Sequence, residues 1–510
     1  MTKTEVSVSP GGGGVGSAAG DLPGKPAAVW DNPVAPVFRS SLEMIGNTPM
    51  LELRNTPSGS CRLFGKLELQ NPSGSVKDRI GLGMIEAAER DGRLDPNADP
   101  KPTIVEGTAG NTGLALALVA LSRGYKMKVV VPDKMAQGKI RHLHAMGADV
   151  ILARSDVQKG DPEYYQDVAE RIAGETPNSL YVNQFANEDN GAAHGATRGP
   201  EIRAQLGAFL AHGASEGKDG GSGTVDVFIG GVGTGGTLTG VGRYLKRHNP
   251  DVKIIAADPV GSIIEPLVNR GEKVEPGGWL VEGMGEDFVP GTCDLDVIDE
   301  AVAVPDGDAF FAARDLLKQE GLLAGSSTGC LLAAARAWCE KQDRPLNVVT
   351  LICDQGAKYL DKIFNDFWMI DQGFIQRERR NDVSDLVMRR HSEREDYTLK
   401  PRDPLRQAIK AMQLHSISQM AVLDEEDTVV GIIDESDILL SVTRDEAAFG
   451  SPVRDHMTTR LETVRSDADV SELLPIFRAD RVAIVVDSDG GYLGLVTKID
   501  LINYLRLRLD

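Results

Sequence analysis

The stretch FIGGVGTGGTLTG, residues 228–240, has the glycine spacing of a loop that binds phosphate. Gly231, Gly233 and Gly236 match the G-x-G-x-x-G pattern of dinucleotide sites, and Asp258 follows at about the 20-residue distance of a ribose-binding carboxylate. A smaller ligand with a single phosphate fits the same loop, because free N–H groups and the dipole of a helix N-terminus favour an anion. The loop by itself leaves both interpretations open.

Lys77 lies in the stretch NPSGSVKDRIG, residues 71–81, directly before a helical pattern. Most lysines are solvated surface charges. Here the small polar residues before Lys77, and the Asp-Arg pair after it, favour a functional role instead. Lysine is the residue that forms a Schiff base with an aldehyde cofactor.

Two further turns are rich in small residues and precede helical patterns. The first is GTAGNTG, residues 107–113, in which Thr108, Asn111 and Thr112 would bind a carboxylate together with backbone N–H groups. An ordinary strand–turn–helix connection has the same sequence pattern. In GLLAGSSTGC, residues 321–330, Ser326 and Ser327 are suited either to cap a helix or to contact a cofactor.

The elements that must position these residues alternate between short β-branched runs and longer helical patterns over residues 39–375. This alternation predicts an α/β domain with a parallel sheet covered on both faces. Ligands of open α/β sheets bind at the carboxyl ends of the strands. We therefore expect the three turns to converge on one edge of the sheet.

The rest of the chain differs in composition. Residues 1–38 contain GGGGVGSAAG and several prolines, which predicts a flexible tail, and residues 376–396 are a charged linker. Residues 397–445 and 452–510 then repeat one pattern of helix, strand, polar turn, strand and helix. Two copies of one supersecondary unit predict a pseudo-symmetric α+β pair.

The bulk composition narrows the class of protein. A net charge of −20 argues against nucleic acid or an anionic membrane as the main partner. Five scattered cysteines without a C-x-x-C pair favour reduced thiols, and no signal peptide core is present, so we expect a cytoplasmic protein. His142 and His144 are two residues apart on a helical pattern and point in different directions, so we predict no metal site.

Together these segments resemble the fold-type II pyridoxal-phosphate enzymes, in the branch of cysteine synthase and cystathionine β-synthase. The motifs NPSGSVKDR, GTAGNTG, GGVGTGGTLTG and EGLLAGSSTG carry the resemblance from about residue 42 to residue 374. The repeat from Leu399 to Leu505 resembles a tandem pair of CBS regulatory domains, which plain cysteine synthases lack. The resemblance implies a fold-type II catalytic domain followed by this α+β module.

The resemblance also implies residue roles. Lys77 would bind pyridoxal 5′-phosphate covalently and act as the base on the substrate Cα, and a Ser327 hydroxyl on the pyridine nitrogen would weaken the electron sink and favour loss of the β-substituent. The other implied cofactor contacts are Asn111, Gly233, Thr234, Gly235, Gly236 and Thr237. The resemblance therefore favours a single phosphate over a dinucleotide as the ligand of the loop. In that case Asp258 is expected to have a structural role.

The implied substrate site contains Thr108, Ala109, Thr112 and Gln184 around the carboxylate. The chain departs from the family pattern at three positions. Ala109 replaces the usual Ser, Phe185 stands where many cystathionine β-synthases carry Tyr, and Glu286 replaces a Tyr common in animal enzymes. A Glu286 carboxylate would attract the ammonium of homocysteine, or it is a solvated loop residue.

The implied reaction is replacement of the serine hydroxyl by homocysteine, through an aminoacrylate intermediate, to give cystathionine for transsulfuration and cysteine biosynthesis. One alternative is a cysteine synthase that uses O-acetylserine and sulfide and carries regulatory domains. Another is a binding or regulatory protein with a degenerate site, which the complete set of implied cofactor residues disfavours.

Further expectations concern other ligands and assembly. No Cys or His precedes Cys61, so we expect no haem of the kind that animal relatives bind in an N-terminal segment. Thr497 and Asp500 stand where relatives hold the ribose of an adenosyl ligand such as S-adenosylmethionine, whereas Asp434 replaces the usual Thr in the first copy. The resemblance implies a homodimer or a higher homo-oligomer.

Overall fold

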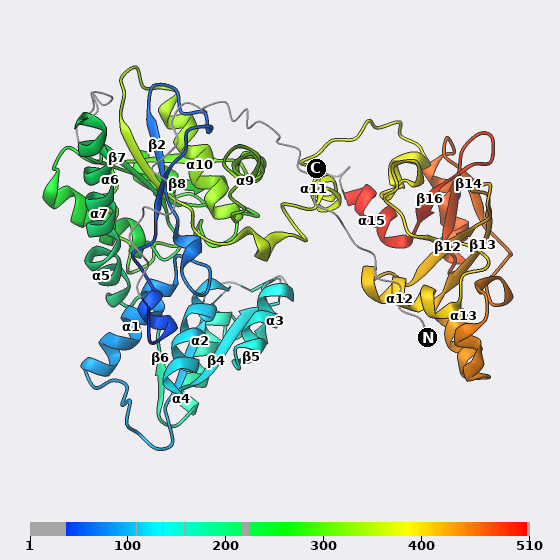
Figure 1. Ribbon diagram of the computed structural model, residues 1–510, viewed down its shortest axis with the longest axis horizontal. Helices are drawn as coiled ribbons and strands as arrows, with labels where there is room; N and C mark the ends of the chain where they lie inside the picture. The colour runs from blue at the N-terminus through cyan, green and yellow to red at the C-terminus, as the bar shows by residue number, and fades with distance from the viewer. Residues whose placement is uncertain are drawn as a thin grey trace, which may run out of the picture.

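The structure is a computed structural model that describes residues 37–108, 110–133, 135, 137–157, 160–215 and 224–506. Figure 1 shows two lobes, which contain strands β1 to β10, and a separate C-terminal module, which contains strands β11 to β16 (right). Within the described residues, no helix has both the length and the apolar character needed to cross a membrane.

The upper lobe is built on a six-stranded sheet that is parallel except at the edge strand β1. In spatial order its strands are β1 (Met50–Glu52), β2 (Arg62–Lys66), β10 (Asn347–Leu351), β7 (Val227–Gly231), β8 (Lys253–Pro259) and β9 (Glu300–Val304). The central strands are continuous apolar runs such as VFIGG and NVVTL, because both faces of the sheet are covered.

Helices cover this sheet on both sides. Figure 1 shows α6 (Arg198–Ser215) and α7 (Gly236–His248) on one side and α9 (Asp306–Glu320) and α10 (Ser326–Cys339) on the other. The short α8 (Ile264–Arg270) contacts β8 and β9.

The lower lobe holds a second, fully parallel sheet of four strands. Its order is β5 (Asp149–Ala153), β4 (Lys126–Pro132), β3 (Thr103–Gly107) and β6 (Ser179–Tyr181). The helices of this lobe and of its junction with the upper lobe are α1 (Asp78–Arg90), α2 (Asn111–Arg123), α3 (Gln137–Ala145), α4 (Tyr165–Glu175) and α5 (Asp189–Ala196).

The expectation of a single sheet edge was wrong. The GTAGNTG turn follows β3 in the four-stranded sheet, whereas the glycine loop at residues 231–236 follows β7 in the six-stranded sheet. The turns therefore meet between two sheets. Alternation of strands and helices has the same appearance for one sheet or two, because strand pairing depends on contacts between distant segments.

The C-terminal module contains two three-stranded sheets of identical topology, each with a parallel and an antiparallel pair. The first sheet has β11 (Thr398–Leu399), β12 (Gln419–Leu423) and β13 (Val429–Asp434), and the second has β14 (Thr463–Arg465), β15 (Ala483–Val486) and β16 (Tyr492–Val496). The helices are α12 (Leu405–His415), α13 (Glu435–Val442), α14 (Leu473–Arg478) and α15 (Lys498–Arg506).

The charged segment 376–396 is not solvated throughout. Val383, Leu386 and Val387 are buried in the core of the second three-stranded sheet. Their spacing of three and one residues places the apolar side chains on one side of a short 3-10 turn, while the half-buried Asp385 between them accepts hydrogen bonds from the Arg380 and Asn381 amides. The C-terminal module also contacts the remainder of the chain at α11 (Asp366–Asp371), where the Arg506 guanidinium donates to the Asp371 carbonyl at 2.9 Å.

Candidate active site

Lys77 is the N-cap residue of α1 and is half-buried. Its amine donates a hydrogen bond to no side chain or carbonyl in the described part of the chain. Burial lowers the pKa of the Lys77 amine, and the nearby Arg198 guanidinium lowers it further. Cys353, Glu286 and Asp354 oppose this shift. A lysine with a lowered pKa and no acceptor is suited to nucleophilic or base chemistry.

Asn111 joins the lower sheet to the Lys77 segment. It begins α2, and its Nδ2 donates to Asp354 Oδ2 at 2.8 Å. Lys358 Nζ donates to Asn111 Oδ1 at 2.8 Å and to the Gly74 carbonyl at 3.3 Å. The turn after β3, the end of β10 and the loop before Lys77 are therefore held together by direct hydrogen bonds.

The residues expected to bind a substrate carboxylate also lie together. Thr112 Oγ1 donates to Gln184 Oε1 at 2.7 Å, and Thr108 Oγ1 accepts from the Gly110 amide at 3.3 Å. All three side chains are buried. Ala109, expected at the same site, lies outside the described residues.

The glycine loop between β7 and α7 has the form of an anion site. Gly235 has φ +80°, and a Cβ at this position would overlap Cys293, so glycine is required there. The backbone N–H groups of residues 233–237 have no acceptor within the described ranges. Asn190 Nδ2 donates to Thr234 Oγ1 at 2.9 Å and fixes one side of the loop. Unpaired N–H groups at the start of a 13-residue helix suit a phosphate.

Asp258 has a local structural partner. The residue is the last but one of β8, within a buried run, and its Oδ2 accepts from the Glu265 amide at the start of α8 at 2.8 Å. This contact fits the structural role that was expected for Asp258.

Ser326 and Ser327 begin α10, but neither side chain caps the helix. Ser326 Oγ accepts from the Glu282 amide at 3.1 Å. Burial raises the pKa of the Cys353 thiol to about 12, and the adjacent Ser327 hydroxyl partly opposes that shift. Because the Cys353 carbonyl accepts from the Val76 amide at 2.8 Å, Ser327 lies close to the segment that carries Lys77.

Glu286 and Phe185 are two of the positions at which the chain departs from the family pattern. Glu286 is half-buried, and its carboxylate acts to raise the pKa values of Lys77 and Tyr164, which places it within electrostatic reach of both. The Phe185 ring packs against Phe288 with 5.7 Å between centroids.

Thr497 directly precedes α15 and Asp500 lies within it, in the C-terminal module, and Figure 1 shows α15 far from α1. Both residues line a cavity of about 640 Å³ between the two sheets of that module, and Thr497 Oγ1 donates to Asp500 Oδ2 at 2.6 Å. In the first copy, Asp434 instead caps α13 by accepting from the Asp437 amide at 2.8 Å.

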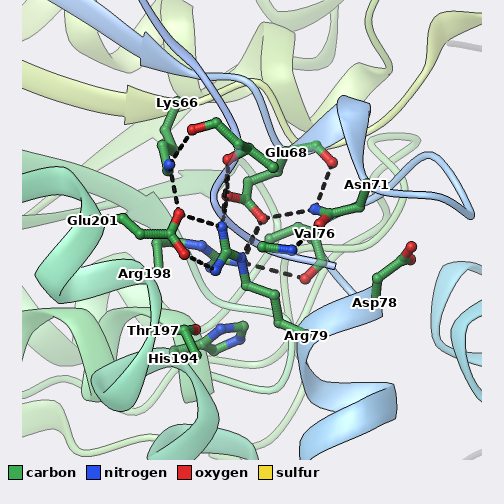
Figure 2. Close-up of polar contacts among 12 residues, drawn as sticks. Lys66, Glu68, Asn71, Val76, Asp78, Arg79, His194, Thr197, Arg198 and Glu201 are labelled. Atoms are coloured by element: carbon green, nitrogen blue, oxygen red, sulfur yellow. Dashed lines mark hydrogen bonds and ion pairs between the residues drawn. The ribbon is translucent and has the colours of Figure 1, made fainter. Parts of the chain in front are cut away.

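A buried ion network lies beneath the site (Figure 2). Arg79 pairs with Glu68 at 2.8 Å and with Glu201 at 2.6 Å, Lys66 pairs with Glu201 at 2.7 Å, and Arg198 pairs with Glu68 at 3.1 Å. Burial acts to raise the pKa of Glu68, but Arg198 and Arg79 hold it well below its usual range. Glu68 is therefore a carboxylate despite having no exposed surface.

Sequence reasoning missed three residues of the site. Asp354 follows β10 closely, so the rule that ligands bind at the carboxyl ends of strands would have marked it. Arg198 and Asn190 begin or lie within helices, and no local pattern marks them. Both reach the site only because α5 and α6 pack against α7.

Comparison with known proteins places these features in a family. A model described as a pyridoxal-phosphate dependent enzyme matches residues 42–354, and one described as a CBS domain matches residues 383–444 and 453–507. A cystathionine β-synthase from Apis mellifera is 33% identical over 474 residues, covering 91% of this chain and 90% of that protein. The chain belongs to the cystathionine β-synthase family. The resemblance seen in the motifs and the predicted tandem CBS module are confirmed.

Other relatives match the catalytic part alone. A cysteine synthase from Staphylococcus aureus is 38% identical over 320 residues, which cover 62% of this chain and 94% of that enzyme. The crystal structure of a hydrogen sulfide-producing enzyme from Fusobacterium nucleatum is 33% identical with a TM-score of 0.55, and covers 64% of this chain and all of that one. Of these three proteins, the cystathionine β-synthase is the one whose match extends over the C-terminal module.

Glu106, in β3, is a buried acid two residues before Thr108, one of the residues expected to bind a substrate carboxylate. It has no exposed surface, and neither of its carboxyl oxygens has a partner in hydrogen-bonding geometry among the described residues. Burial raises the pKa of Glu106 to about 8, and the backbone amides of Gln184 and Asn183 offset part of the shift. The carboxyl group is therefore protonated at neutral pH.

We expect Glu106→Gln to make the protein less sensitive to alkaline pH. Between an unfolded pKa near 4.5 and a folded pKa of about 8, the native state binds the extra proton, so stability falls as pH rises through this window. From pH 5 to pH 8.5, the free energy of unfolding of the wild type should fall by about 2–4 kcal/mol more than that of the variant. Urea unfolding at both pH values measures this. The exposed Glu275→Gln variant is the control, and a pH-independent difference would contradict the assignment.

Proposed function

We propose that this chain replaces the β-hydroxyl of L-serine with the thiol of L-homocysteine, giving L-cystathionine and water, with pyridoxal phosphate as cofactor. The observation that carries this proposal is the match to a cystathionine β-synthase over 91% of the chain, C-terminal module included. A cysteine synthase covers only 62% of the chain.

The residues of the site fit this cofactor. Lys77 would hold it covalently through an amine that has no other hydrogen-bond partner in the described ranges. The unpaired N–H groups of residues 233–237 would hold its phosphate. Asn111 would contact its 3′ oxygen, and the Ser327 hydroxyl its pyridine nitrogen. When bound, pyridoxal phosphate supplies an electron sink for negative charge at the substrate Cα.

The remaining steps are the work of side chains. Thr108, Thr112 and Gln184 would hold the substrate carboxylate so that the Cα–H bond faces Lys77. Because the pKa of Lys77 is lowered, a larger fraction of the released amine is neutral and accepts the Cα proton. The β-hydroxyl then leaves as water, and the homocysteine sulfur forms the new bond to Cβ.

A paired product assay tests the proposal. One reaction contains serine and homocysteine, the other O-acetylserine and sulfide, and products are identified by mass spectrometry. Faster formation of cystathionine supports the proposal. Faster formation of cysteine assigns the chain to the cysteine synthase reaction. If neither product forms, the assignment of the site is refuted.

Glu286 is our candidate for recognition of the homocysteine ammonium. We expect Glu286→Ala to raise the homocysteine concentration for half-maximal rate by about tenfold, the size of one charge-assisted hydrogen bond. The absorbance change on adding serine alone should stay intact, because that step precedes the second substrate. Glu275→Ala, which removes an exposed carboxylate, is the matched control. If the homocysteine concentration for half-maximal rate is unchanged in Glu286→Ala, this role is excluded.

The C-terminal cavity is proposed to bind an adenosyl ligand. Its lining includes Thr497 and Asp500, together with the aromatic Tyr397 and Tyr492. Hydroxyl and carboxylate groups suit ribose, and aromatic rings suit a base. Calorimetric titration with S-adenosylmethionine checks this proposal, and absence of heat on titration would count against it.

A further inference from the structure

Arg198 is the largest fully buried side chain of the described residues, with 0% exposure. It begins α6 and makes three contacts with its two terminal nitrogens. Nη2 donates to Glu68 Oε2 at 3.1 Å and to the Val76 carbonyl at 3.2 Å, and Nη1 donates to Thr237 Oγ1 at 3.3 Å. One guanidinium thus joins the ion network, the residue before Lys77 and the glycine loop at residues 233–237.

The ion network of Figure 2 has an excess of positive charge. Its cations are Lys66, Arg79 and Arg198, and its anions are Glu68 and Glu201, so three positive charges face two negative ones. Asp78 lies beside the network but forms no ion pair with it among the described residues: its carboxyl group accepts from Ser73, and burial raises its pKa, which favours the neutral form. A buried charge in excess is costly unless an anion pairs with it.

The surroundings of Thr237 indicate where such an anion would lie. Thr237 is half-buried at the start of α7, in the stretch whose N–H groups are unpaired. The helix N-terminus adds a partial positive charge to that of Arg198. Both features therefore favour an anion beside the Thr237 hydroxyl.

The Thr237 hydroxyl is itself oriented by two neighbours. Arg198 can only donate to it. His194 Nε2 lies 3.2 Å away, while His194 Nδ1 has no partner among the described residues. Burial keeps His194 neutral, since its pKa is well below the usual range.

The tautomer of His194 follows from the hydrogen-bond network. Because an orphaned buried N–H is rarer than an orphaned acceptor, the proton of the ring belongs on Nε2, which then donates to Thr237. Two donors occupy the acceptor positions of the hydroxyl. Its own proton is left to donate to a third group.

We propose that Arg198 is a positioning residue for the cofactor phosphate: it supplies the charge that balances the phosphate and orients the Thr237 hydroxyl proton toward it. This inference rests on the proposed function, because it takes pyridoxal phosphate as the ligand of the glycine loop. It adds a fixed cation to a loop that otherwise binds through backbone N–H groups.

Comparison of pyridoxal phosphate with pyridoxal, which lacks the phosphate, tests the role. Cofactor-free protein is titrated with each compound, and binding is followed by absorbance. Arg198→Met should weaken binding of pyridoxal phosphate about tenfold to hundredfold, the effect of losing a charge-assisted contact, and leave pyridoxal binding unchanged. Arg198→Lys should recover part of the loss, because it restores the charge without the fork of donors.

The controls separate this role from a structural one. Arg336, on α10, also has a buried Nε without a partner, and Arg336→Met should leave the preference for the phosphate unchanged. In a Thr237→Val background, Arg198→Met should weaken binding of pyridoxal phosphate by a smaller factor, because the hydroxyl that Arg198 orients is already absent. Equal weakening for both compounds, or no weakening, overturns the inference. If the wild type binds neither compound, the proposed function itself is overturned. If Arg198→Met folds poorly, Arg198→Lys decides instead, by the ratio of its affinities for pyridoxal phosphate and pyridoxal.

Discussion

Replacing Lys77 with alanine is expected to lower kcat for cystathionine formation by about three orders of magnitude or more, the scale of losing a catalytic base that is also the covalent anchor. The expectation follows from the position of the amine. It stands at the N-terminus of α1 with a lowered pKa and no hydrogen-bond acceptor within the described residues. The Lys358 amine, which also has a lowered pKa, differs from it because it donates to Asn111 Oδ1 and to the Gly74 carbonyl.

Two measurements check this result. Single-turnover product formation gives the rate, and borohydride reduction followed by peptide mass mapping locates the covalently held cofactor. The cofactor mass should be found on the Lys77 peptide of the wild type and be absent from Lys77→Ala. Lys362→Ala is the control, because Lys362 is ion-paired to Glu282 at 2.7 Å on a partly exposed side chain and should change kcat by less than about threefold. Product formation near the wild-type rate in Lys77→Ala would remove Lys77 from the mechanism.

The second large effect is expected on stability. Glu68→Gln should lower the free energy of unfolding by about 3–5 kcal/mol, the usual cost of leaving buried charges without their partner. Glu68 pairs with Arg79 and Arg198, and all three side chains have at most 1% exposure. Both guanidiniums stay charged after the substitution, because arginine does not lose its proton in proteins. Only Glu201 then remains as an anion of the network.

Glu52 offers a matched comparison for this prediction. It also pairs with two arginines, Arg54 and Arg62, but their side chains are 74% and 28% exposed. Glu52→Gln should therefore cost no more than about 1 kcal/mol. Urea unfolding of both variants beside the wild type gives the two differences. Similar costs at the two positions would show that burial of the network does not determine its contribution.

Much of the candidate site could be predicted from the sequence, because its turns have local requirements. A left-handed position such as Gly235 favours glycine, and the first N–H groups of a helix are free to donate to an anion. Lys77 before α1 and the two repeated units of the C-terminal module are likewise marked within a few residues of sequence. These segments also carry the family motifs.

The tertiary structure decided what those local requirements leave open. Strand pairing divided the predicted single sheet into two and placed the site between them, and the packing of Val383, Leu386 and Val387 drew part of the predicted linker into a core. Arg198 acquired its partners in the same way.

The physical reason is the separation of the contacts along the chain. Arg198 lies 130 residues from Glu68, and Asn111 lies 243 residues from Asp354. The charge of a buried group, and the partner that balances it, depend on which distant segments exclude water around it. Residue types and their spacing therefore predicted which turns offer N–H groups to an anion and which lysine is suited to react, whereas only the folded chain placed Arg198 beside the glycine loop at residues 233–237.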